Sequence, residues 1–103
     1  LKDIIIRKGE NISAKEVEDL LFTHPDVADV AVVGLPDERS GERACAVVVA
    51  AGGATPTLHA LNEHLLSRGL MKQKLPEQLE LVDALPRNPT GKVLKFELRD
   101  RFG

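Results

Sequence analysis

Two apolar, β-branched stretches limit what this chain can fold into more than any other feature. Residues 27–33 and 43–50 are rich in valine and alanine and contain few polar positions. They are separated by residues 34–42, which are polar and rich in turn-forming residues, so the pattern predicts a β-hairpin. Because the stretches are apolar at nearly every position rather than at every second one, we expect the sheet to be covered on both faces.

Helix signals lie on either side of these stretches. Ser13 followed by Glu16 predicts a capping box, in which the serine side chain accepts from the Glu16 amide and the glutamate reaches back to the Ser13 amide. Pro25 should end this first helix. A second helix is expected to start at residues 55–56, a threonine cap and a first-turn proline, and to close at Gly69.

The remaining segments complete the order of elements. Residues 79–82 alternate like a short strand, and residues 93–102 have the apolar spacing of a last helix. Residues 86–91 form a rigid, turn-rich segment between them. The predicted order is helix, hairpin, helix, strand, helix. It indicates the α+β class: a small compact domain whose short central sheet includes a β-hairpin and is packed by about three helices.

Composition argues against two classes of partner. The net charge is −2, and the chain has no tryptophan or tyrosine and only three phenylalanines. Nothing in this charge balance favours nucleic-acid binding, and the chain offers no aromatic platform on which bases could stack. No stretch approaches the roughly 18 consecutive apolar residues of a membrane span. We expect no nucleic acid and no transmembrane segment.

Cysteine and histidine suggest no site by their spacing. Cys45 lies inside an apolar stretch and is predicted to be a buried structural thiol, which fits a reducing cytoplasm. His59 and His64 are five residues apart, so they do not share a helix face, and His24 precedes a proline. We expect all three histidines at the surface and no metal site.

Residues 90–92, Thr-Gly-Lys, look like the end of a phosphate-binding P-loop. The match fails because Val93 replaces the required serine or threonine and Pro86 stands where the first glycine belongs. Composition and pattern alone therefore indicate an α+β domain without an active site of its own.

Two longer motifs, one near each end of the chain, resemble a known family. Residues 2–18 read KDIIIRKGENISAKEVE, and residues 86–95 read PRNPTGKVLK. They are similar to the opening and closing motifs of the C-terminal domain in the adenylate-forming superfamily of acyl- and aryl-CoA synthetases, peptide-synthetase adenylation domains and firefly-type luciferases. Residues 24–34, HPDVADVAVVG, resemble a stretch typical of the CoA-ligase branch, so the chain looks most like a fatty-acid–CoA ligase.

The resemblance implies an activity shared with a larger protein. In the family, a carboxylic acid and ATP form an acyl-adenylate and pyrophosphate on a large N-terminal domain; the small domain then rotates, and CoA takes the acyl group and releases AMP. Residues 1–103 would be that small lid domain, a fragment without the large domain and inactive alone. ATP, Mg²⁺ and CoA would be the cofactors, and the partners the N-terminal domain and a fatty or other hydrophobic acid.

Three residues take roles in this scheme by their place in the motifs: Lys92 as the catalytic residue, Gly91 as a cofactor-binding residue and Lys2 as the hinge. Lys92 matches the catalytic lysine for adenylation. An ammonium group there would stabilise the charge that builds as a carboxylate attacks the α-phosphate. Gly91 beside it would leave the backbone free to adjust. Lys2 falls at the hinge about which the domain turns.

A second group resembles the loop that lines the pantetheine tunnel in the thioester-forming state. Gly9 lies in that loop, where a glycine lets the backbone approach a thin ligand closely, and Lys8 and Glu10 flank it. Many relatives carry a second glycine at the position of Lys8. Arg7 and Lys15 are, with Lys8, candidates for contact with CoA phosphates.

Two other functions remain open. In the first, the chain is the subdomain of a peptide-synthetase adenylation domain and serves a carrier protein that would follow it. In the second, it is a non-catalytic interaction module of similar fold, with no large domain upstream. The acid is not specified here, because its pocket would lie on the large domain.

Overall fold

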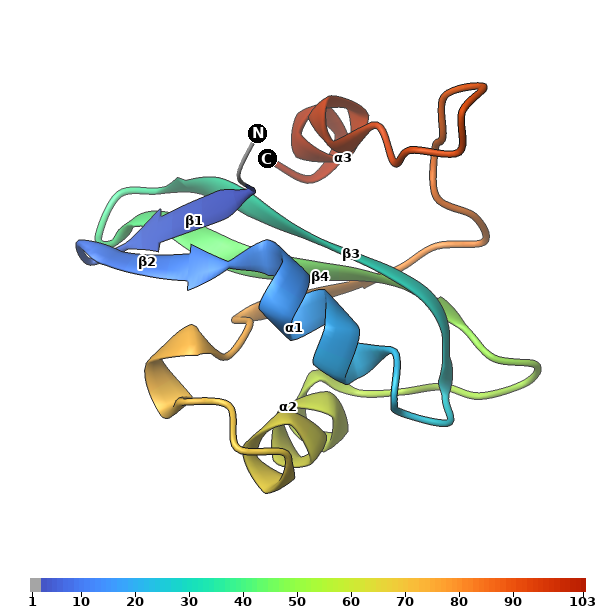
Figure 1. Cartoon of the computed structure of the whole chain (residues 1–103). Helices are drawn as coiled ribbons and strands as arrows, with labels where there is room; N and C mark the ends of the chain where they lie inside the picture. Colours follow the sequence, from blue (N-terminus) through green and yellow to red (C-terminus); the bar gives the residue numbers. More distant parts are fainter. Residues whose placement is uncertain (1–2) are drawn as a thin grey trace.

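The structure is a computed structural model that describes residues 3–103. It contains a sheet with helices on both faces (Figure 1). The elements are, in chain order, β1 Ile4–Arg7, β2 Glu10–Ser13, α1 Ala14–Leu21, β3 Val27–Asp37, β4 Gly41–Ala50, α2 Leu58–Ser67, a short 3-10 helix η1 Lys72–Lys74, β5 Gln78–Leu81 and α3 Lys95–Phe102. The predicted α+β class, hairpin and three helices are confirmed.

The long β3–β4 hairpin is the centre of the five-stranded sheet. β4 pairs with β3 along its length, with β1 near one end and with β5 in parallel. The prediction that residues 34–42 form a loop is wrong, because pairing continues to Asp37 opposite Gly41. The Asp37 side chain makes this short turn possible: its Oδ1 accepts from the amides of Arg39 and Ser40 at 2.9 and 3.0 Å.

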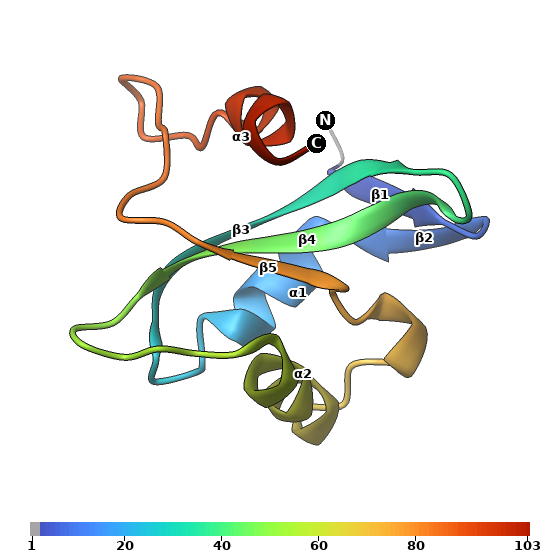
Figure 2. The ribbon, with the colours of Figure 1, turned by 180° about the vertical axis from the view of Figure 1, so that it is seen from behind.

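Both faces of the hairpin are buried, as expected from its apolar pattern. One face packs against α1 and α2, and the other against α3, which Figures 1 and 2 show on opposite sides of the sheet. Alternate residues of each strand go to opposite faces. The first core includes Val30, Val32, Ala44, Ala46 and Val48, and the second Ala31, Val33, Leu35, Cys45 and Val47. The predicted burial of Cys45 is confirmed, and burial raises the pKa of its thiol to about 12.

Helix α1 has half of the predicted capping box. Ser13 Oγ accepts from the Glu16 amide at 3.2 Å, as expected. The Glu16 carboxylate does not close the box; it pairs with Lys74 Nζ at 3.2 Å and so connects α1 to η1. The helix ends at Leu21, ahead of Pro25.

Helix α2 begins two residues later than the sequence suggested. Thr57, rather than the threonine at residue 55, is the cap, and its side chain accepts from the Ala60 amide at 3.1 Å. Gly69 follows the helix end with a φ of +89°, as expected for a closing glycine.

The hairpin of β1 and β2 was not predicted. Its two-residue turn is formed by Lys8 and Gly9, whose φ angles are +53° and +77°, as such tight hairpin turns require. The Lys8 amide donates to Ser40 O at 2.7 Å, which joins this turn to the turn of the β3–β4 hairpin.

The expectation that all three histidines lie at the surface holds fully for His59 and partly for the other two. His24 and His64 are partly buried and stack edge to face, with ring centroids 4.8 Å apart. His64 Nε2 also lies 2.7 Å from Thr23 Oγ1. Only His59 is exposed. The fold brings the end of α1 against α2, which the sequence spacing does not reveal.

Candidate functional site

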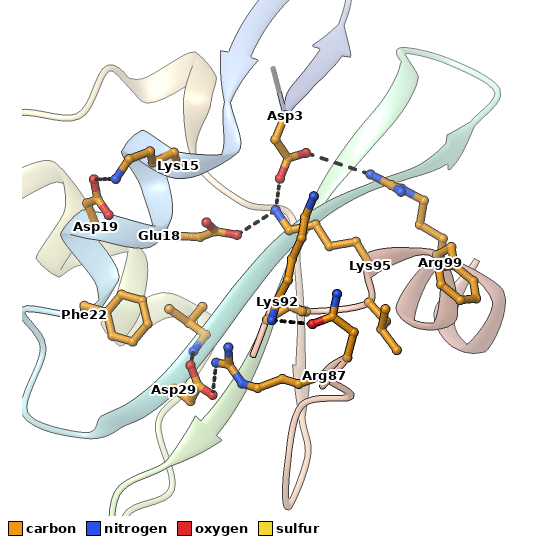
Figure 3. Close-up of a pocket in the computed structure, with 15 residues that line it drawn as sticks. Asp3, Lys15, Glu18, Asp19, Phe22, Asp29, Arg87, Lys92, Lys95 and Arg99 are labelled. Carbon is orange, nitrogen blue, oxygen red and sulfur yellow. Dashed lines mark hydrogen bonds and ion pairs between the residues drawn. The ribbon is translucent and has the colours of Figure 1, made fainter. Parts of the chain in front are cut away.

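An open cavity of about 810 Å³ lies where α1, β3 and the segment that leads into α3 meet (Figure 3). Its lining mixes basic, acidic and aromatic side chains. They include Asp3, Lys15, Glu18, Asp19, Phe22, Asp29, Arg87, Lys92, Lys95, Phe96 and Arg99. The adenylation lysine of the sequence analysis, Lys92, is therefore placed at a concave surface where opposite charges gather.

The turn that carries Lys92 is organised by Asn88. Asn88 Oδ1 accepts from the amides of Thr90 and Lys92 at 3.1 and 2.9 Å and from Thr90 Oγ1 at 2.7 Å. Gly91 takes a φ of +89°, a conformation in which glycine avoids the strain of other residues. The predicted turn over residues 86–91 is confirmed, and it fixes the backbone of Lys92.

Arg87 attaches this turn to the sheet. One guanidinium nitrogen donates to Gly91 O at 2.6 Å, and the other pairs with Asp29 Oδ2 of β3 at 2.7 Å. The planar guanidinium presents its donors in a fixed geometry, so it can bridge two acceptors at once.

The Lys92 side chain differs from its neighbours. It is exposed, and within residues 3–103 its ammonium has no hydrogen-bond or ion-pair partner. A lysine on a fixed backbone with an unused ammonium can reach an anion that arrives from outside the domain.

Lys95 is a site residue that the sequence analysis missed. Its Nζ is bonded to Asp3 and pairs with Glu18 Oε2 at 2.8 Å (Figure 3). It also donates to Val32 O at 2.9 Å. Burial, with a smaller contribution from Arg99, lowers the pKa of Lys95 to about 8. One sequence signal was available: a lysine in the first turn of a helix opposes the helix dipole, so it needs another reason to be there.

Glu18 is the acidic partner in this cluster. Its Oε2 accepts from the Val32 amide at 2.8 Å. Burial raises the pKa of the Glu18 carboxyl, although the bond from Val32 acts in the opposite direction. The carboxylate, the ammonium of Lys95 and the backbone of Val32 thus contact one another.

The second predicted group lies elsewhere. Lys8, Gly9 and Glu10 form the turn of the β1–β2 hairpin, at the end of the sheet away from the Lys92 turn in both views (Figures 1 and 2). A Cβ on Gly9 would meet no atom within 4 Å, so the turn is open to its surroundings. Lys8 adopts the left-handed conformation although it is not a glycine. The structure does not bring Gly9 and Lys92 together.

The other candidates are placed as follows. The Arg7 guanidinium is occupied by Glu77 at 2.6 Å and by Gln73 O at 3.1 Å. Lys15 lines the cavity and pairs with Asp19 at 2.9 Å, on a different element from Lys8. The predicted hinge, Lys2, lies outside the described residues. No helix in the described part of the chain is both long enough and apolar enough to cross a membrane.

Comparison with known proteins agrees with the sequence resemblance. Residues 16–92 match the model of the AMP-binding enzyme C-terminal domain. A fatty acid–[acyl-carrier-protein] ligase, ScoC of Streptomyces coeruleorubidus, is 49% identical over 99% of this chain and 20% of its own length. A medium-chain fatty-acid–CoA ligase of Escherichia coli is 46% identical over 95% of this chain and 18% of its own length.

Solved structures give the same result. The apo structure of Mycobacterium smegmatis MbtA superposes with a TM-score of 0.94 at 42% identity, over 98% of this chain and 19% of that one. The chain therefore spans about a fifth of the length of the relatives that it matches. The family model matches residues 16–92, and these relatives are similar along nearly the whole chain. The chain therefore belongs to the C-terminal domain family of AMP-binding enzymes, in the adenylate-forming superfamily.

Proposed function

We propose that the chain is the mobile C-terminal domain of an ATP-dependent acyl-CoA synthetase, an acid–thiol ligase. The parent enzyme converts a carboxylic acid, ATP and CoA into acyl-CoA, AMP and pyrophosphate. The large N-terminal domain is the partner of this domain and binds ATP, Mg²⁺ and most of the substrates. The acid is a fatty or other hydrophobic acid, because relatives 46–49% identical to this chain are named as ligases of fatty acids.

The exposed, unpaired ammonium of Lys92 carries this proposal. The turn around Asn88 fixes the backbone of Lys92, while the side chain projects at an open cavity without a partner in residues 3–103. During adenylation, the acid carboxylate attacks the α-phosphate, pyrophosphate leaves, and negative charge grows on the phosphoryl oxygens. An ammonium delivered there stabilises the transition state more than the ground state.

The β1–β2 turn supplies the surface for the second half-reaction. In this scheme, Gly9 with Lys8 and Glu10 borders the path of the pantetheine arm, and the domain turns at Lys2 to exchange the two surfaces. The separation of the two surfaces supports this scheme. The β1–β2 turn and Lys92 lie at different ends of the sheet (Figures 1 and 2). One orientation of this domain on the N-terminal domain therefore does not present both surfaces equally. The buried, unpaired thiol of Cys45 is compatible with a cytoplasmic enzyme.

A carrier protein is the second candidate for the acyl acceptor. The relative that is 49% identical is named as a ligase that acts on an acyl-carrier protein, and others are named as a pyochelin synthase and a triostin synthetase. A carrier protein presents the same phosphopantetheine thiol as CoA, so the first half-reaction and the role of Lys92 would be unchanged.

Lys92→Ala in the full-length parent enzyme tests the proposal. We expect adenylate formation, measured by pyrophosphate exchange, to fall at least about 100-fold, as for loss of a donor that acts on the transition state. Thioester formation from supplied acyl-adenylate should stay close to wild type. Lys72→Ala, at an exposed lysine of η1, is the control and should change neither step. Equal loss in both half-reactions would contradict the role assigned to Lys92.

The acceptor is tested separately. The wild-type parent enzyme is given the acyl-adenylate with either CoA or a phosphopantetheinylated acyl-carrier protein, and the thioester product is quantified. Preference for CoA supports the synthetase. Preference for the carrier protein would leave the adenylation chemistry in place and replace the proposed acceptor.

A further inference from the structure

The outer edge of β3 is covered by side chains from two helices. β3 stands at the end of the strand order and pairs with β4 on one side. At Val32, on the other side, the amide donates to Glu18 Oε2 at 2.8 Å and the carbonyl accepts from Lys95 Nζ at 2.9 Å. Because Glu18 and Lys95 also pair at 2.8 Å, the three residues form a closed ring.

This ring joins helices that lie on opposite faces of the sheet. Glu18 belongs to α1, which packs with α2 in one core, whereas Lys95 is the first residue of α3, which packs in the other. The ion pair therefore passes around the edge of β3 and fixes the start of α3 to the rest of the domain. Lys92 lies three residues before that point, so the ring anchors the downstream side of its turn.

The same ammonium reaches the beginning of the described chain. Lys95 Nζ is bonded to Asp3, whose other carboxylate oxygen lies 3.9 Å from Arg99. Asp3 is further held by its carbonyl, which accepts from the Ala14 amide at 3.0 Å. Asp3 directly follows Lys2, the proposed hinge residue. Lys95 thus connects the α3 side of the Lys92 turn to the residue next to the hinge.

The upstream side of the Lys92 turn has an anchor of its own. Arg87 bridges Gly91 O and Asp29 Oδ2, and Asp29 is on β3, three residues from Val32. Both sides of the turn are therefore fixed to the same strand by a cation. In the chain, Lys92 lies between Arg87 and Lys95, and its ammonium has no partner within residues 3–103.

We propose that Arg87 and Lys95 are positioning residues that clamp the two sides of the Lys92 turn to β3, so that Lys92 moves as one body with the residues next to the hinge. This inference rests on the proposed role of Lys92. Neither cation needs to touch a substrate. The charges of Arg87 and Lys95 instead set the position of the turn. An ion pair that joins three elements fixes their relative position more specifically than an apolar contact does.

Three variants of the full-length parent enzyme test the clamp. Lys95→Met removes the charge and keeps the stem, Arg87→Gln removes the bridge, and Arg101→Met, at an exposed cation on the same helix as Lys95, is the control. We expect kcat for adenylation to fall about 10- to 100-fold in the first two, as for misplacement of a catalytic group by about 1 Å. KM for ATP and thioester formation from supplied acyl-adenylate should change less than about threefold, and the control should match wild type in all three.

Amide hydrogen exchange of the same variants gives a readout that does not depend on activity. Lys95→Met and Arg87→Gln should accelerate exchange in peptides that cover residues 86–94 and leave the β3–β4 hairpin at wild-type rates. A purely structural role would instead accelerate exchange throughout the domain and lower both half-reactions together, and that result would overturn the clamp.

Lys92→Ala, assayed in parallel, separates the two proposals. If Lys92→Ala abolishes adenylation while Lys95→Met and Arg87→Gln leave it intact, the clamp is wrong and the role of Lys92 stands. If Lys92→Ala leaves adenylation unchanged, the role of Lys92 and the clamp both fail, because there is then no group to position.

Discussion

Asn88 bonds the backbone of Lys92 at both of its polar groups. Its Oδ1 accepts from the Lys92 amide at 2.9 Å, and its own amide donates to Lys92 O at 2.9 Å. The first of these bonds depends on the side chain, so substitution can remove it while the second remains.

Asn88→Ala should therefore loosen the Lys92 turn without unfolding the domain. We expect kcat for adenylation in the parent enzyme to fall about 10-fold, because the backbone that carries the ammonium is no longer held in one place. The comparison is Asn11→Ala, the same substitution at an exposed position of β2, which should leave adenylation unchanged. Unaltered adenylation in Asn88→Ala would show that the turn does not position Lys92.

Gly91 and Gly69 form a matched pair for testing the turn. Both have a φ of +89°, and a Cβ on either would meet no atom within 4 Å. Gly91→Ala and Gly69→Ala should each cost about 1–2 kcal/mol of stability from the left-handed backbone alone. Only Gly91→Ala should also slow adenylation. Thermal unfolding and pyrophosphate exchange measure the two effects, and an equal loss of adenylation in both variants would contradict the prediction.

Gly9 and Gly53 are the corresponding pair for the β1–β2 turn. Each has a φ of +77° and open space at the position of a Cβ. We expect Gly9→Ala and Gly53→Ala to destabilise the fold similarly, by about 1–2 kcal/mol. Gly9→Ala alone should raise the KM for CoA, because the added methyl group narrows the proposed path of the pantetheine arm. If the KM for CoA is the same in both variants, this turn does not line the path.

The Glu42 carboxylate occupies the space in which a side chain at Gly34 would lie. A Cβ at Gly34 would lie 2.7 Å from Glu42 Oε2, and Glu42 Oε1 accepts from the Ile6 amide at 2.9 Å. Gly34→Ala should displace the carboxylate, break that bond between the hairpins and cost about 1 kcal/mol of unfolding free energy.

Denaturant unfolding of the two single variants and the double variant checks this explanation. Glu42→Ala should lose a similar amount, and Gly34→Ala should cost almost nothing further in that background, since the displaced group is already gone. Fully additive losses would mean that Gly34 matters for another reason.

The unfolding free energy of the domain should depend on pH through the Asp37 carboxyl. The amides of Ser40 and Arg39 lower the pKa of this carboxyl below its ordinary value of 3.8. The folded state therefore binds fewer protons there than the unfolded state. Its contribution is complete above the ordinary value and is lost as pH falls through the lowered pKa.

The Asp37→Asn variant tests that dependence, because asparagine keeps an acceptor oxygen and cannot titrate. Its unfolding free energy should decline less steeply than that of wild type as the pH is lowered below about 4. Urea unfolding across that range measures both slopes. Parallel curves would show that Asp37 is not one of the groups that couple folding to acid.

Much of the fold could be predicted because its signals are local. The uninterrupted valine and alanine stretches predicted a hairpin buried on both faces, and both cores use them. Ser13 and Gly69 marked helix ends through bonds and backbone angles that depend on nearby residues. These patterns predict the structure because each involves groups only a few positions apart in the chain.

The rest depends on contacts between distant residues. The isoleucines of β1 follow one another without alternation, so the first hairpin had no period-two signal. The loop expected over residues 34–42 is mostly strand because Asp37 closes the turn early. Lys95 meets its partners 92 and 63 residues away, and motif spacing cannot reveal such a contact.

The ring at Val32 also affects whether another chain can add a strand at the outer margin of β3. An unpaired strand margin is a template on which another chain can add a strand, and this leads to aggregation. Here a carboxylate and an ammonium already occupy the donor and acceptor of Val32. An incoming strand would have to displace this partly buried ion pair before it could form its first bond at Val32. The same charges therefore disfavour self-association along this margin.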